Sequence, residues 1–172
     1  DNGWFSKCEE HKSGLTGRSS LDGQCHETTF DAAYQLCANA DGRLCTKEEA
    51  EASCTRGTGC GHDADLIWTC TEEGGACSAS IECCSGHCNE NGGCQPPSSD
   101  PDPSSMPSVA PSLAPSPNPN SNQNDPTNLR WVVCGRGVGP GLTVCDEGDA
   151  KQVNKDELHE VRCCKELDGN AI

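Results

Sequence analysis

Six cysteines in residues 70–94 are the residues of this chain with the clearest chemistry. They follow the spacing C-x6-C-x5-C-C-x3-C-x5-C. Adjacent Cys83 and Cys84 cannot easily pair with each other, so each must reach elsewhere, and the short loops force the bridges to interlock. Spacing alone does not choose among the fifteen pairings that six cysteines allow. Because a disulfide framework persists only in an oxidising environment, the stretch predicts a secreted protein, extracellular or at the cell surface.

Residue types that ligate metals or catalyse reactions also occur, but in incomplete patterns. Cys60 and His62 carry zinc-ligand atoms, yet the chain has no CxxC pair and secreted cysteines usually prefer disulfides. Asp63 and Asp65 offer oxygen ligands for calcium without a full EF-hand loop, so a solvated acidic loop is the default interpretation. No Gly-x-Ser-x-Gly motif accompanies the serines. We therefore expect no metal, no cofactor and no enzymatic activity.

The composition argues against one large core. The 172 residues include 16 cysteines, and only 3% of the residues are aromatic. Several small cross-linked modules are more plausible. The formal net charge of −15 argues against nucleic acid and anionic membrane surfaces as partners, and no apolar run is long enough to insert in a membrane. The start at Asp1 without a signal-like segment favours a processed chain or an excised unit of a longer one.

Four segments follow from the distribution of cysteine and proline. Residues 1–69 form a cysteine-rich α+β module, and residues 70–94 hold the six cysteines described above. Residues 95–128 form a Pro/Ser-rich stalk, and residues 129–172 form a cysteine-rich β segment that is small for an independent domain.

Local patterns predict the elements that position these cysteines. Apolar residues at helical spacing predict a helix over residues 30–38, with Thr28 or Thr29 as its N-cap and Asp41-Gly42 at its end. Thr46-Lys47-Glu48-Glu49 matches a capping box that opens a second helix to about Ser53. Extended pieces are expected at residues 43–45, 66–68, 129–134 and 159–164.

Residues 96–126 contain ten of the eleven prolines and eight serines, with no Lys, Arg or aromatic residue. This composition cannot bury a core and favours an extended polyproline II stalk. Its Ala-Pro-Ser-Pro and Ser-Val-Ala-Pro-Ser sequences resemble hydroxyproline-rich glycoproteins of plant and algal walls. Sugar here would be O-linked, since no Asn-x-Ser/Thr sequon occurs, and the alternative is a bare disordered spacer. The expected sites are Ser98, Ser99, Ser104, Ser105, Ser108, Pro111, Ser112, Pro115, Ser116, Pro117, Ser121 and Thr127.

The stretch CTEEGGACSASIECCSGHCNENGGC resembles the inhibitor cystine knot, or knottin, family. The resemblance covers residues 70–94 and implies the bridges Cys70–Cys84, Cys77–Cys88 and Cys83–Cys94. The expected fold class is then a set of small disulfide-rich α+β modules with a knottin insert and an extended polyproline II linker. The other ten cysteines are expected in disulfides of open pairing: Cys8, Cys25, Cys37, Cys45, Cys54, Cys60, Cys134, Cys145, Cys163 and Cys164.

The two outer segments resemble one module when they are placed end to end. HEVRCCKELDGNAI followed by DNGWFSKCEE, then GRLCTKEEA and GTGCGHDADLIWT, is similar to a cysteine-rich module of secreted diatom and algal surface proteins. Residues 29–68 also resemble the first helices and strand of Link and C-type-lectin-like domains. The sugar-binding pattern of the calcium lectins is missing, so this second likeness implies fold more than function.

The end-to-end order predicts a head-to-tail contact with a second copy of the chain. If residues 129–172 complete the module of a neighbouring unit, each copy completes the next, and the contact propagates as a filament unless it closes into a ring. One long polypeptide with a 172-residue period is an alternative. A monomer whose ends meet across the stalk is another. The expected interface residues are Trp4, Phe5, Trp68, Trp131, Val132, Val133 and Val161.

These features favour a structural subunit of an extracellular glycosylated filament or cell-wall assembly of an alga. A secreted carbohydrate-binding, lectin-like module is the alternative. A knottin-type inhibitor is a third hypothesis, but the loops of residues 70–94 carry glutamates with no Lys or Arg, which favours a scaffold role.

Overall fold

The computed structural model describes residues 15–52, 54, 56–96, 126–135, 145 and 150–166. Its helices are α1 (Phe30–Asn39) and α2 (Lys47–Glu51), and 3-10 turns occupy His62–Ala64, Ser80–Glu82 and Pro126–Asn128. Its strands are β1 (Leu15–Arg18), β2 (Glu27–Thr28), β3 (Arg43–Thr46), β4 (Leu66–Cys70), β5 (Leu129–Cys134), β6 (Ala150–Asn154), β7 (His159–Glu160) and β8 (Cys163–Glu166).

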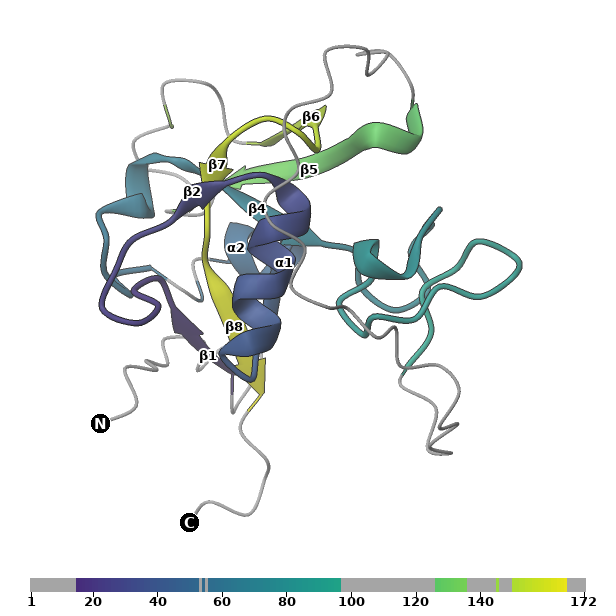
Figure 1. The fold of residues 1–172 in the computed structure, drawn as a ribbon, viewed down its shortest axis with the longest axis horizontal. Helices are drawn as coiled ribbons and strands as arrows, with labels where there is room; N and C mark the ends of the chain where they lie inside the picture. The colour runs from purple at the N-terminus through teal and green to yellow at the C-terminus, as the bar shows by residue number, and fades with distance from the viewer. Residues whose placement is uncertain are drawn as a thin grey trace.

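One mixed sheet joins the two outer segments of the chain (Figure 1). The strand order is β1-β8-β3-β4-β5-β6, with β2 and β7 paired beside it. Strand β8 lies between β1 and β3 and is antiparallel to both, while β5 pairs antiparallel with β4. The first and last segments therefore complete each other within a single chain, which was one of the alternatives left open by the sequence.

Helix α1 covers the middle of the sheet because its apolar positions recur at helical spacing. Phe30, Ala33 and Cys37 are fully buried. The predicted helix is confirmed, and the chain turns after it at Asp41, whose φ of 58° is left-handed, while Gly42 N–H donates to Cys37 O at 2.9 Å. Thr29 occupies the N-cap position, but its side chain makes no capping hydrogen bond.

The predicted capping box of α2 is present. Thr46 Oγ1 accepts from the Glu49 N–H at 3.1 Å, and the Thr46 N–H donates to Glu49 Oε2 at 2.9 Å. Arg43 donates to both carboxylate oxygens of Glu49, at 2.8 and 2.7 Å. The helix ends at Glu51, slightly before the predicted Ser53.

Trp68 lies at the centre of the core. Its ring meets the Phe30 ring edge-on at 5.5 Å, and its Nε1–H donates to Thr28 O at 2.7 Å. Val132 and Val161 belong to the same buried cluster.

Four of the seven expected interface residues are therefore core residues of the same chain: Trp68, Val132, Val133 and Val161, each 0% exposed. The expectation that the valines need a neighbouring unit differs from the structure because β4, α1 and α2 of the same chain supply their apolar partners. Trp131 is 39% exposed, and Trp4 and Phe5 lie outside the described residues.

Two disulfides fasten the last strand to the first segment. Cys37–Cys163 joins α1 to β8, and Cys45–Cys164 joins β3 to β8. Cys25–Cys60 and Cys134–Cys145 each close within one outer segment, and Cys54 is also disulfide-bonded. The sequence left these pairings open, and Cys8 lies outside the described residues.

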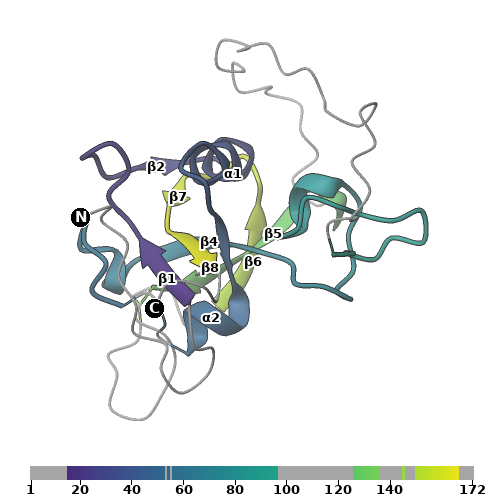
Figure 2. The ribbon, with the colours of Figure 1, turned by 90° about the horizontal axis from the view of Figure 1, so that it is seen from below.

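Residues 71–96 extend to one side of the sheet beside β5 (Figure 2). The bridges of residues 70–94 are Cys70–Cys84, Cys77–Cys88 and Cys83–Cys94, the three pairs implied by the knottin resemblance. The segment is not separate from the module, because Cys70 is the last residue of β4 and Ile81 packs against the core. A boundary between residues 69 and 70 therefore cuts a strand.

Candidate functional site

A groove of about 620 Å³ lies where the sheet meets residues 71–96, which we call the cysteine-rich loop. We call it the Trp131 groove. Its lining comes from the start of α2, the end of β4, the loop that follows, β5 and β6: Lys47, Glu48, Thr69, Cys70, Thr71, Glu72, Gly75, Ala76, Cys77, Ser78, Glu82, Thr127, Leu129, Arg130, Trp131 and Gln152.

The groove exists because α2 is short. Ala50 of α2 packs on Ile67 of β4 and Val133 of β5, and α2 ends at Glu51. Trp131 lies on the same face of β5, two residues before Val133 and opposite Gln152 of β6, with Lys47 at the start of α2 beside its ring.

Trp131 is held by its backbone and partly shielded by a lysine. Thr69 Oγ1 donates to Trp131 O at 3.1 Å, and Lys47 Nζ lies 4.6 Å from the centre of the ring. The ring remains 39% exposed, and within the described residues its Nε1–H donates to no acceptor. A flat, partly exposed aromatic ring among polar side chains is the composition of a recognition site for a ligand.

The wall of the groove is anchored by a buried ion pair. Arg130 donates to Glu82 Oε1 at 2.8 Å, and both side chains are 9% exposed. The same guanidinium donates to Thr127 O at 2.7 Å, while Glu82 also accepts from the Ser78 N–H at 3.1 Å. These bonds fix the cysteine-rich loop against β5, so the groove is largely preformed.

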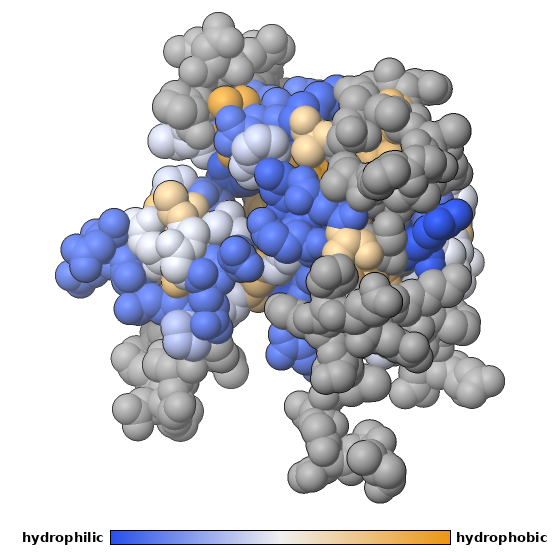
Figure 3. Space-filling view, turned by 180° about the vertical axis from the view of Figure 1, so that it is seen from behind, coloured by the Kyte–Doolittle hydropathy of each residue, from blue (hydrophilic) through white to orange (hydrophobic). Residues whose placement is uncertain are grey.

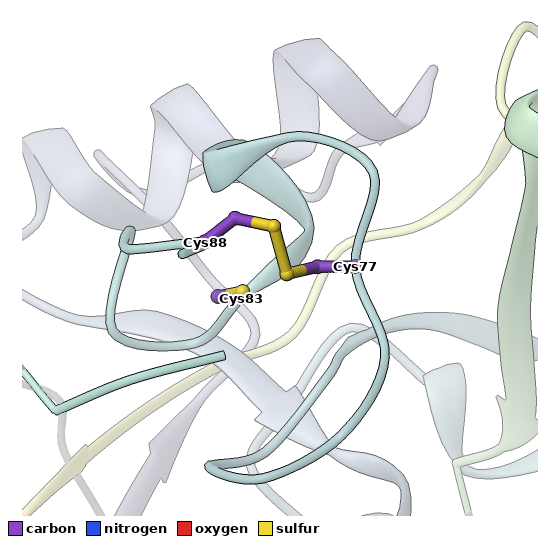
Figure 4. Close-up of side chains that lie close together, drawn as sticks. All are labelled: Cys77, Cys83 and Cys88. Carbon is purple, nitrogen blue, oxygen red and sulfur yellow. A yellow bond between two sulfur atoms is a disulfide. The ribbon is translucent and has the colours of Figure 1, made fainter. Parts of the chain in front are cut away.

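Two groups of potential metal ligands occur among the described residues, and both are disulfide sites. Cys77 and Cys88 are bonded to each other beside Cys83, which is bonded to Cys94 (Figure 4). The second group is Cys45, Glu49 and Cys164, in which the two cysteines form a bridge. Disulfide sulfurs offer no thiolate to a metal, so neither group is a metal site in the oxidised protein.

Arg162 forms a buried polar network that ties distant loops together. Its side chain is 0% exposed, and it donates to Ser19 Oγ at 2.9 Å, Gly135 O at 2.6 Å and Asp63 Oδ1 at 3.1 Å. Burial lowers the pKa of Arg162, and the carboxylates of Asp63 and Asp65 oppose that change. Asp63, considered above as a calcium ligand, is thus a partner of a buried cation.

Three carboxylates, Glu27, Asp65 and Glu160, line a smaller surface depression. Burial, together with the nearby carboxylates of Asp65 and Glu27, raises the pKa of Glu160 to about 7. A carboxyl group whose pKa is raised in the folded state binds more protons when folded, so its stabilising contribution is lost as pH rises from about 4.5 to about 7.

Replacing Glu160 with glutamine is expected to flatten the pH dependence of stability in that window and to raise the melting temperature above pH 7. Thermal unfolding of both proteins over a pH series measures this. The control is Glu90→Gln, which removes the same formal charge from an exposed position. Parallel pH profiles for the wild type and Glu160→Gln would contradict the expectation.

The remaining expected site residues fall outside the described part of the chain, with one exception. Thr127 is exposed and lines the Trp131 groove, whereas the serines and prolines expected to carry sugar lie in residues 97–125. Sequence reasoning missed the groove because Trp131-Val132-Val133 is uniformly apolar, which hides the outward position of the tryptophan.

Within the described residues, no helix combines the length and apolar character needed to cross a membrane. The coloured residues on the face seen in Figure 3 are mainly hydrophilic, with the hydrophobic ones in small patches. The dense disulfide bonding is consistent with an extracellular protein.

No protein-family model, no curated protein and no solved structure matches this chain.

Proposed function

We propose that this protein is a structural subunit of an extracellular assembly, a filament or cell-surface layer of an alga, built head to tail from copies or repeats of the chain. The observation that carries the proposal is the register between the first and last strands. β1 and β8 are antiparallel neighbours, with Leu15 opposite Glu166.

This register suits a chain that runs from one unit into the next. After Glu166, a following copy would reach its own β1 through residues 167–172 and then 1–14. Antiparallel strands with the end of one opposite the start of the other have the geometry of a hairpin. The β8 of one copy and the β1 of the next are therefore able to form the pair that β8 and β1 form within a single chain.

The long connection between residues 96 and 126 makes exchange between copies possible. Residues 129–166 supply strands β5 to β8, and residues 15–70 supply strands β1 to β4. The same strands would fit the sheet of a neighbour without new contacts, and the bridges from Cys163 and Cys164 would then join different copies. A run of such exchanges gives a covalently linked filament.

The test is refolding of an isotope mixture. Unlabelled and ¹⁵N-labelled protein are reduced, denatured, mixed, and reoxidised at high concentration, and disulfide-linked peptides are analysed by mass spectrometry. Head-to-tail exchange predicts mixed-isotope peptides that join Cys37 to Cys163 and Cys45 to Cys164.

The chain contains its own controls for this experiment. Cys25–Cys60 and Cys134–Cys145 each lie within one outer segment, so exchange leaves them in single-isotope peptides. If the Cys37–Cys163 peptides also carry one isotope only, at every protein concentration, the subunit is a closed monomer and head-to-tail exchange is wrong.

The finer parts of the proposal concern the insert and the linker. We propose that residues 70–94 are a knottin-type scaffold, and their pairing of bridges supports this. We also propose that residues 97–125, which end before the 3-10 turn of Pro126–Asn128, form an O-glycosylated polyproline II stalk, which sugar would shield from proteolysis. Mass analysis of the native stalk peptide tests the second point, and an unmodified mass would refute it.

A further inference from the structure

The Trp131 groove has no role in the fold described above. Among the described residues, Trp131 and Leu158 are the two large hydrophobic side chains that remain exposed, at 39% and 58%. Leu158 lines the small depression beside Glu160, whereas Trp131 lies in the larger groove, which has a wall anchored by the Arg130–Glu82 ion pair.

We propose that the Trp131 groove binds the proline-rich segment of a second copy of this chain, within residues 104–119. The inference rests on the proposed self-assembly and names a contact that the exchange of strands does not supply.

The negative charge of the chain and the few unpaired charges of the groove favour an uncharged ligand. The chain carries a net charge of −15, so an acidic segment of another copy would be repelled. Arg130 and Glu82 neutralise each other, which leaves Lys47, Glu48 and Glu72 as the remaining charges of the lining. Residues 104–124 contain no ionisable side chain, and residues 104–119 contain the apolar part of that stretch.

The chemistry of the groove suits a polyproline II peptide. Such a helix has no internal hydrogen bonds, so it presents prolyl rings and free carbonyl oxygens on its surface. A prolyl ring can lie on the exposed part of the Trp131 ring, as in other aromatic-lined grooves that bind proline-rich peptides. The Trp131 Nε1–H, the Gln152 amide and the Lys47 ammonium are donors for the carbonyls.

The position of the groove also favours this occupant. Thr127, which lines the groove, directly follows the proline-rich residues 96–126 in the chain. When residues 129–166 of one copy complete the sheet of its neighbour, Thr127 brings the proline-rich segment of its own chain beside α2 and the cysteine-rich loop of that neighbour. A segment of a second copy is then tethered next to each groove, which raises the local concentration of ligand.

The receptor for the test is the full chain with residues 104–119 replaced by a Gly/Ser sequence of equal length, so that no copy carries its own ligand. The probe is a fluorescently labelled synthetic peptide of residues 104–119, and binding is followed by fluorescence anisotropy. We expect a dissociation constant between about 1 μM and 1 mM, and at least about a tenfold loss of affinity in Trp131→Ala.

Two controls accompany the measurement. Leu158→Ala removes the other exposed hydrophobic side chain and is expected to leave binding unchanged. A peptide with Pro107, Pro111, Pro115 and Pro117 replaced by alanine is expected to bind at least about tenfold more weakly. Since Trp131 is partly exposed, its variant should fold, and the melting temperature verifies this.

Three outcomes would overturn the inference. The first is that receptors with Trp131 and with Trp131→Ala bind the peptide equally well. The second is that the groove binds a neutral hexasaccharide, but not the peptide, in a way that depends on Trp131. The third is that the groove is already occupied in isolated native monomers at every dilution. The mixed-isotope refolding experiment described above detects which disulfides form and is independent of peptide binding in the groove. Trp131-dependent peptide binding without mixed-isotope peptides would therefore keep the groove contact and reject strand exchange.

Discussion

Removing both Cys37–Cys163 and Cys45–Cys164 by alanine replacement is expected to cost about 7–8 kcal/mol, which would unfold most of the protein, whereas removing either bridge alone should cost about 3 kcal/mol. The bridges close loops of 126 and 119 residues in the sequence. While one of the two bridges remains, the other closes only a small loop, which consists of residues 37–45, residues 163–164 and the remaining bridge. The cost of the second removal is therefore the entropy of the long loop.

Guanidinium denaturation of the oxidised proteins, followed by tryptophan fluorescence, measures this. Replacing Cys77 and Cys88 with alanine is the matched control, because that bridge spans 11 residues and should cost about 3 kcal/mol. Strict additivity of the two single removals would show that the long loop does not limit stability.

Arg162→Met is expected to lower the free energy of unfolding by about 3–5 kcal/mol. The guanidinium is fully buried, and the variant leaves the Asp63 carboxylate, Ser19 Oγ and Gly135 O without their shared donor. Arg162→Lys should be intermediate, since an ammonium cannot reproduce the planar fork that contacts all three groups.

Arg56→Met is the control for this variant, because Arg56 is exposed and should change stability by less than about 0.5 kcal/mol. The double variant Arg162→Met, Asp63→Asn should recover part of the loss by removing the orphaned charge. A loss below about 1 kcal/mol in Arg162→Met would mean that the network is replaced by water.

Local structure could be predicted from the sequence where it depends on neighbouring residues. The spacing of Phe30, Ala33 and Cys37 predicted α1, and Thr46 with Glu49 predicted the start of α2. The bridges of residues 70–94 came from a family resemblance and not from spacing, which leaves the pairing open.

Long-range arrangement could not be predicted in the same way. The residues of a strand such as β8 do not indicate which strands it pairs with, so its position between β1 and β3 is visible only in the folded chain. Arg162 is buried although a lone charge rarely is, because residues 19, 63 and 135, which lie far apart in the sequence, supply its acceptors. Trp131 was expected in an interface with a neighbouring unit, and its place in a groove of the same chain, 39% exposed, is visible only in the folded structure.

The Cys37–Cys163 bridge also determines how the protein would respond to a pulling force at its ends. Between Leu15 and Glu166, the shortest covalent path runs along residues 15–37, crosses the bridge and continues along residues 163–166. Tension would bypass the cysteine-rich loop, the proline-rich segment and most of the sheet. The fully extended path is about 95 Å long, compared with about 500 Å for the reduced chain. Units that keep this bridge within one chain and are linked through their ends, as repeats of one polypeptide would be, would thus form a cord of limited stretch, and a reducing agent would make it several times more extensible. In a filament of exchanged strands the bridge would join two copies, and tension would run through residues 37–163 of each copy instead.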